Sequence, residues 1–86
     1  MRIIAFHQEA FEQYNEWATH DKNAFDRLKR LIAETARTPF EGIGKPEPLK
    51  RELKGYWLRR ITDEHRLVYK VTNEQIVIAS CKYHYE

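Results

Sequence analysis

Residues 56–71 constrain the fold of this chain most, because they have the pattern of a β-hairpin. Two runs rich in β-branched and aromatic residues, 56–62 and 65–71, flank the polar pair Asp63 and Glu64. Such runs around a short polar break predict two paired strands. Both runs also carry arginine where a strand more often has threonine or valine, at Arg59, Arg60 and Arg66. We therefore expect this hairpin to hold an anion.

The length of the turn decides which arginines share a face of the hairpin. If the turn comprises residues 62–64, Arg60 pairs with Arg66, and the alternation of side chains places both guanidinium groups on one side. A shorter turn instead sets Arg60 opposite Leu67 and separates the two charges. Two neighbouring arginines repel each other, so they need either an external anion or a carboxylate of the chain between them. The candidate carboxylates are Glu47, Glu52 and Glu64.

The first half of the chain predicts a short strand and two helices. Residues 2–6 contain enough β-branched and aromatic residues for a short strand, and apolar residues then recur at helical spacing over 8–19. Asp21 is well placed as the N-cap of a second helix. Pro39 ends that helix, because proline disfavours the helical conformation of the residue before it and lacks a backbone N–H. The apolar stripes of the two helices predict core positions, and the helices together predict an antiparallel helical hairpin.

From residue 49 onward the pattern has period two, which predicts a sheet. We expect strands near 49–53, 57–62, 65–71 and 75–83, joined by short turns that make consecutive strands antiparallel. The whole chain, 1–86, is then expected to form a single α+β domain. In it, a short N-terminal strand precedes a two-helix antiparallel hairpin, which packs on one face of a mostly antiparallel sheet of four to five strands.

The connector 38–48 lies between the two halves and contains all three prolines and two of the three glycines. It is either a mobile linker or an ordered functional loop. Within it, Glu47 stands between Pro46 and Pro48, which restrict the backbone around it. Such a residue is usually a solvated loop glutamate, but a carboxylate held in place is also what a general base requires.

Charge and cysteine usage narrow the classes of function. Residues 1–43 carry six Lys/Arg against seven Asp/Glu, whereas residues 44–86 carry nine against six. The positive excess therefore lies in the half with the hairpin, as expected for contact with phosphate. A lone Cys81 excludes an internal disulfide, and the scattered histidines indicate no metal site, so we expect no cofactor. The apolar run near the N-terminus is too short for a signal peptide or a membrane span, which favours a cytoplasmic protein with no membrane partner.

The chain ends in a basic and aromatic segment, Lys82, Tyr83, His84 and Tyr85, followed by Glu86. These residues are either frayed terminal positions or a functional tail. In the second case His84 would transfer a proton near neutral pH, and the aromatic rings would stack on a base.

Three segments closely resemble the YoeB toxins, a family of the RelE/ParE-like superfamily of bacterial toxin–antitoxin systems. The resemblance covers essentially the whole chain in order and spacing and rests on 38–50 (TPFEGIGKPEPLK), on RRIT and EHRLVY within 59–69, and on the ending KYHY. It implies a RelE-like fold and an endoribonuclease that cuts messenger RNA in the ribosomal A site. It also implies neutralisation by a YefM-type antitoxin, a homodimer, and contact with DNA only through the antitoxin complex. Ser80, Lys82 and Glu86 depart from the usual residues of the family.

The resemblance also implies roles for individual residues. Glu47 matches the general base, Arg66 the arginine that stabilises the phosphate, and His84 the general acid. Lys50, Arg60 and Tyr85 match supporting residues around the scissile phosphate. Two other functions stay open: a ParE-like toxin that binds gyrase, and a non-catalytic co-repressor that acts with the antitoxin. A base paired with an acid argues against the first, because an inhibitor of gyrase needs neither.

Overall fold

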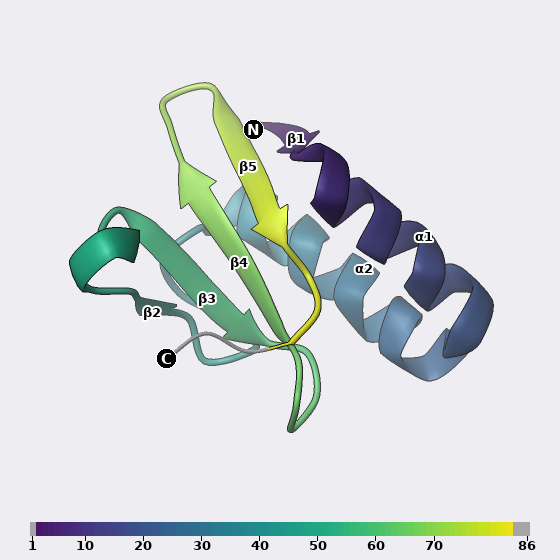
Figure 1. The fold of residues 1–86 in the computed structure, drawn as a ribbon. Helices are drawn as coiled ribbons and strands as arrows, with labels where there is room; N and C mark the ends of the chain where they lie inside the picture. Colours follow the sequence, from purple (N-terminus) through teal and green to yellow (C-terminus); the bar gives the residue numbers. More distant parts are fainter. Residues whose placement is uncertain (1, 84–86) are drawn as a thin grey trace.

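The computed structural model describes residues 2–83, in which two helices cover one face of a sheet (Figure 1). The strands are β1 (Ile3–Phe6), β2 (Glu47–Pro48), β3 (Tyr56–Arg60), β4 (Arg66–Val71) and β5 (Gln75–Ser80), and the helices are α1 (Gln8–His20), α2 (Lys22–Arg37) and a 3₁₀ turn, η1 (Arg51–Leu53). The strands form a five-stranded sheet in the order β1-β5-β4-β3-β2. Only the pairing of β1 with β5 is parallel among the described strands. The predicted α+β architecture is confirmed.

The helices form as the apolar spacing predicts. The carboxylate of Asp21 caps α2 by accepting a hydrogen bond from the backbone N–H of Ala24 at 3.0 Å, and α2 ends at Arg37, just before the Thr38–Pro39 step. Most of the two apolar stripes faces the sheet and buries a common core that includes Trp17, Leu28, Leu31, Ile61, Leu67, Tyr69, Ile76 and Ile78. Phe11 of the first stripe is an exception, since it is 48% exposed. Among the described residues, no helix is long and apolar enough to cross a membrane.

The hairpin has the longer of the two predicted turns. Arg60 pairs with Arg66 across β3 and β4, and the backbone N–H of Ile61 donates to the carbonyl of His65 at 2.9 Å. Residues 62–64 therefore form the turn. The side chains of Arg60 and Arg66 share a face of the sheet, as predicted for a turn of this length.

The prediction of a strand over 49–53 is wrong. The pairing with β3 is confined to β2, whose Glu47 and Pro48 lie opposite Leu58 and Trp57. Beyond it, Arg51 adopts a left-handed conformation with φ 59°, which breaks the extended chain and begins η1. Proline is tolerated in β2 because this strand is at the edge of the sheet, where an N–H is not needed for a second partner.

The last strand is shorter than the predicted 75–83. Tyr69 pairs with Ile78 but Val68 pairs with Ser80, so Ala79 is an extra residue that bulges from β5. The backbone N–H of Cys81 then donates to the side-chain oxygen of Gln13 on α1 at 2.7 Å. Because α1 has taken this donor, the chain leaves the sheet after Ser80.

Candidate functional site

The face of the sheet opposite the helices carries three of the predicted site residues, Glu47, Arg60 and Arg66. Along β3 and β4, the side chains of Trp57, Ile61, Leu67 and Tyr69 belong to the core on the helix side. Alternation therefore turns Leu58, Arg60, Arg66 and Val68 to the other face. We call this face, which the helices do not cover, the open face. Leu58 and Val68 are nearly buried on it, at 5% and 2% exposed, and we call this pair its apolar floor.

Glu47 lies in the same row of the sheet as this floor. It pairs with Leu58 on β3, which in turn pairs with Val68 on β4. Residues opposite each other on neighbouring strands point to the same face, so the carboxylate of Glu47 projects from the open face. The Arg60–Arg66 pair forms the next row. Arg60 is the diagonal neighbour of Glu47, at a spacing of about 7–8 Å for such pairs, and Arg66 lies one strand further away. The fold thus brings Glu47 and the two arginines to one face.

The connector that carries Glu47 is ordered, and a buried arginine anchors it. The side chain of Arg59 is fully buried and donates to three connector carbonyls, those of Thr38 at 2.6 Å, Glu41 at 2.9 Å and Ile43 at 2.9 Å. Its Nε donates to the hydroxyl of Tyr69 at 3.2 Å. Burial raises the pKa of Tyr69, an effect that Arg59 partly offsets. Of the three hairpin arginines, Arg59 is therefore structural and points away from the site, as alternation predicts.

Backbone contacts hold the guanidinium of Arg66. Its Nη1 donates to the carbonyls of Thr62 at 2.8 Å, His65 at 3.1 Å and Asp63 at 3.2 Å. The turn therefore fixes one edge of a planar group whose donors suit a phosphate. None of Glu47, Glu52 and Glu64 forms an ion pair with Arg60 or Arg66. The alternative in which one of these carboxylates neutralises the arginines is not what the structure shows.

The supporting residues divide between two hollows. Lys50 lines one together with Glu47 and Leu58, at the point where η1 begins. Arg60 is exposed and lines a neighbouring hollow with Lys45 and Thr62. Lys50 is therefore grouped with Glu47, and Arg60 lies beside this group.

His84 and Tyr85 lie outside the described residues. The chain that leads to them is described as far as Tyr83, whose carbonyl accepts a hydrogen bond from the backbone N–H of Arg66 at 2.9 Å. The residue that directly precedes His84 in the sequence is thus bonded to the backbone of Arg66.

Two further residues of the open face were not among the predicted site residues. Tyr56 pairs with Lys70 across β3 and β4, and the ammonium of Lys70 lies 5.8 Å from the centre of the Tyr56 ring. Both have the same strand parity as Arg60 and Arg66, and this parity is the signal that could have identified them. They extend the open face by one cation and one aromatic ring.

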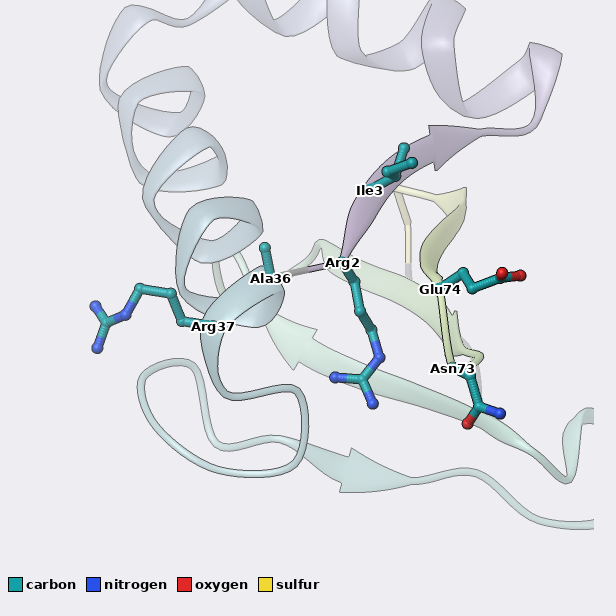
Figure 2. Close-up of a pocket in the computed structure, with 6 residues that line it drawn as sticks. All are labelled: Arg2, Ile3, Ala36, Arg37, Asn73 and Glu74. Carbon is teal, nitrogen blue, oxygen red and sulfur yellow. The ribbon is translucent and has the colours of Figure 1, made fainter.

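A further hollow lies at the other end of the sheet and contains none of the predicted residues. It is lined by Arg2, Ile3, Ala36, Arg37, Asn73 and Glu74. Figure 2 shows Arg37 and Glu74 directed to opposite sides, with Arg2 between them. The Nε of Arg2 donates to the carbonyl of Thr72 at 2.6 Å, so this arginine has a structural contact. Within residues 2–83, no group of three or more His, Cys, Asp or Glu side chains is placed to hold a metal ion.

Residues 6–85 match the family model described as the YoeB-like toxin of bacterial type II toxin–antitoxin systems. The chain belongs to this family. It is 55% identical to "Toxin YoeB" of Streptomyces coelicolor, over 95% of this chain and 98% of the relative. The structure of the YoeB dimer from Staphylococcus aureus has a TM-score of 0.90 and 48% identity, covering 98% of each chain. The heterotetrameric YoeB–YefM complex from the same organism has a TM-score of 0.89 and 48% identity, covering 99% of each chain.

These findings confirm the resemblance noted in the sequence. The YoeB family and the RelE-like fold account for the element order, with a short strand, two helices and a mostly antiparallel sheet. Of the residues carried over from the family motifs, Glu47, Arg60 and Arg66 lie on one face of that fold, and Lys50 lines a hollow with Glu47.

Proposed function

We propose that this YoeB family member is a ribosome-dependent endoribonuclease that cleaves messenger RNA in the ribosomal A site and so inhibits translation. The observation that carries the proposal is the pair of neighbouring rows on the open face, Glu47 with the apolar floor and Arg60 opposite Arg66. Within residues 2–83, neither arginine forms an ion pair with Glu47, Glu52 or Glu64. A carboxylate on the same face as two such arginines suits a phosphodiester next to a hydroxyl that must lose its proton.

The proposed reaction is a general acid–base attack within the RNA and requires no metal. Glu47 removes the proton of the 2′-hydroxyl, and the 2′-oxygen attacks the adjacent phosphorus. Arg66, supported by Arg60 and Lys50, stabilises the charge on the phosphorane oxygens. The bond to the 5′-oxygen breaks, and His84 donates the proton that this oxygen takes up, while Tyr85 supports the base or phosphate. The products are a 2′,3′-cyclic phosphate and a 5′-hydroxyl.

The ribosome supplies what the protein alone lacks in this scheme. A carboxylate is a far weaker base than the alkoxide that it must generate from the 2′-hydroxyl. Holding the RNA in a reactive geometry can lower a barrier by about 7–11 kcal/mol, so a ribosome that positions the codon compensates for a weak base. This gives a physical reason for dependence on the ribosome.

Binding partners follow from the relatives. Because YoeB of Staphylococcus aureus is described as a dimer and as a heterotetramer with YefM, we propose a YefM-type antitoxin and a homodimer for this chain. Contact with DNA would then be made through the antitoxin complex. The protein would act in the cytoplasm, where its ribosomal substrate is found.

Mapping RNA 5′ ends on purified ribosome complexes tests the activity and the site together. We expect Glu47→Gln and Arg66→Ala each to lower the cleavage rate by about 100-fold or more. The matched controls are Glu74→Gln, in the hollow at the other end of the sheet, and Arg30→Ala, on the exposed side of α2, which should cleave at the wild-type rate. Folded Glu47→Gln and Arg66→Ala proteins that cleave normally would overturn the site. In cells that express the protein, growth arrest without new RNA 5′ ends would instead favour the gyrase-binding alternative.

A further inference from the structure

The segment that follows β5 is bonded to α1 through buried polar side chains. The indole N–H of Trp17 donates to the carbonyl of Cys81 at 2.7 Å. The side-chain oxygen of Gln13 accepts from the backbone N–H of Cys81 at 2.7 Å and from the hydroxyl of Ser80 at 3.2 Å. Gln13 and Trp17 are only 9% and 6% exposed. Both backbone groups of Cys81 are therefore fixed before the chain reaches Tyr83.

The backbone of Tyr83 also forms two hydrogen bonds, one with His65, just before β4, and one with Arg66, the first residue of β4. Its N–H donates to Nδ1 of His65 at 2.8 Å, and its carbonyl accepts from the N–H of Arg66 at 2.9 Å. The His65 ring stands edge-on to Trp17, with centroids 4.8 Å apart and an interplanar angle of 87°. His65 therefore links the indole that holds Cys81 to the peptide that precedes His84.

The contact with Tyr83 defines the state of the imidazole. A backbone N–H can only donate, so Nδ1 of His65 must accept and carries no proton in this arrangement. The imidazole is neutral, with its hydrogen on Nε2.

The contact also has little to do with the core. The Tyr83 side chain is 65% exposed, and its backbone has a left-handed φ of 61°, a conformation that is unfavourable for a residue with a β-carbon. Strained conformations of this kind persist where the surroundings hold them in place, often at functional sites. The two hydrogen bonds of Tyr83 thus fix the backbone at this position, although its side chain buries little surface.

We infer that His65 is a positioning residue that fixes the peptide of Tyr83 beside the backbone of Arg66 by accepting the Tyr83 N–H, an inference that rests on the proposed function and on His84 as its acid. His65 does not touch the RNA in this assignment. It acts through the chain, by fixing the peptide before His84 against the backbone of Arg66.

Two substitutions separate this role from simple packing. His65→Asn keeps an acceptor close to the position of Nδ1 but loses the ring. His65→Phe keeps a ring against Trp17 but has no acceptor. On ribosome-bound messenger RNA, we expect His65→Phe to lower kcat by about 100-fold with little change in KM, since a displacement of about 1 Å can cost that much. His65→Asn should retain most of the wild-type kcat.

Which of the two variants loses more kcat decides between a positioning role and a packing role for His65. If the ring serves only to pack against Trp17, His65→Asn will be impaired more than His65→Phe. That result overturns the inference, and so does an equal loss in both variants or a fully active His65→Phe protein.

Two readouts on the purified protein do not depend on activity. Nitrogen-15 spectra should show the Nε2–H tautomer of His65, and the Tyr83 amide proton should exchange slowly in the wild type and in His65→Asn but rapidly in His65→Phe. Rapid exchange in the wild type overturns the inference. A wild-type protein that keeps this protection but cleaves no ribosome-bound RNA overturns the proposed function itself, and the positioning role with it.

Discussion

Leu31 on α2 lies so close to Gly44 that a β-carbon on Gly44 would approach its Cδ2 to 2.7 Å. The same β-carbon would lie 3.0 Å from Cβ of Arg59, and Gly44 has a left-handed φ of 83°. The carbonyl of Gly44 accepts from the N–H of Arg60 at 2.7 Å. A glycine here therefore lets the connector pass between α2 and β3 while remaining bonded to the strand that carries Arg60.

We predict that Gly44→Ala destabilises the protein by about 1–3 kcal/mol more than Gly55→Ala does, because overpacking adds to backbone strain. Gly55 is a matched control, since it has a φ of 100° but a β-carbon added to it would meet nothing within 4 Å. Urea unfolding of the two variants measures the difference. Equal losses of stability in the two variants would show that the connector moves away from the added β-carbon without a further loss of free energy of unfolding.

The contacts of Arg59 lead to a second prediction about stability. Replacing it by leucine leaves the carbonyls of Thr38, Glu41 and Ile43 without their donor. These hydrogen bonds are partly buried, and an acceptor left unsatisfied costs up to about 1–3 kcal/mol, so Arg59→Leu should lower the free energy of unfolding by about 1–3 kcal/mol. Arg60→Leu, one residue along on the exposed face, should change it by about 0.5 kcal/mol or less. A small effect of Arg59→Leu in urea unfolding would mean that the connector is held by other contacts.

These contacts also show which parts of the site can be predicted from the sequence. Side-chain parity is a local property, so alternation along one strand suffices to put Arg59 and Arg60 on opposite faces. That Arg66 shares a face with Arg60 depends on the length of the turn, which the sequence left open between two values. The partners of Arg59 are backbone carbonyls, which every residue has, and no residue pattern marks them. The same holds for the N–H of Tyr83 that His65 accepts.

The wrong strand at 49–53 has a similar cause. Its alternating residues are compatible with an extended chain, but the backbone N–H of Leu49 donates to the carbonyl of Tyr56 at 2.8 Å, and Arg51 turns left-handed immediately afterwards. A hydrogen bond between residues on either side of a turn decides where pairing ends. Spacing in the sequence does not contain that information. Likewise, helical spacing places Trp17 in the core but does not show that its indole N–H fixes Cys81.

The single cysteine gives a third prediction, on reactivity. Burial raises the pKa of the Cys81 thiol from 9.0 to about 12, against a smaller opposite effect of Lys82. Only about one thiol in ten thousand is then ionised at pH 8, and the thiolate is the reactive form. We expect the folded protein to react with a disulfide reagent far more slowly than the urea-unfolded protein. Comparable rates in both states would contradict a buried thiol.

The same shift predicts how stability depends on alkaline pH. A folded-state pKa above that of the unfolded chain means that the native state favours the protonated thiol. Its contribution to stability is complete below about pH 9 and is lost as pH rises toward 12. Cys81→Ala should remove this part of the decline in the urea midpoint. The raised pKa of Tyr69 acts in the same direction from about pH 10, so some alkaline loss should persist in the variant.

The last prediction concerns Lys70, which shares the open face with Arg60 and Arg66 by strand parity. A cation that contacts the RNA backbone releases counterions, and for single strands each one contributes about 0.7 to the slope of log K against log salt concentration. We expect Lys70→Gln to reduce the magnitude of this slope by about 0.7, measured by fluorescence anisotropy with a short single-stranded RNA in a Glu47→Gln background that prevents cleavage. Arg30→Gln removes an equal charge from the exposed side of α2 and should leave the slope unchanged. If both substitutions lowered the slope equally, the RNA would be responding to net charge, and the open face would have no special part in binding it.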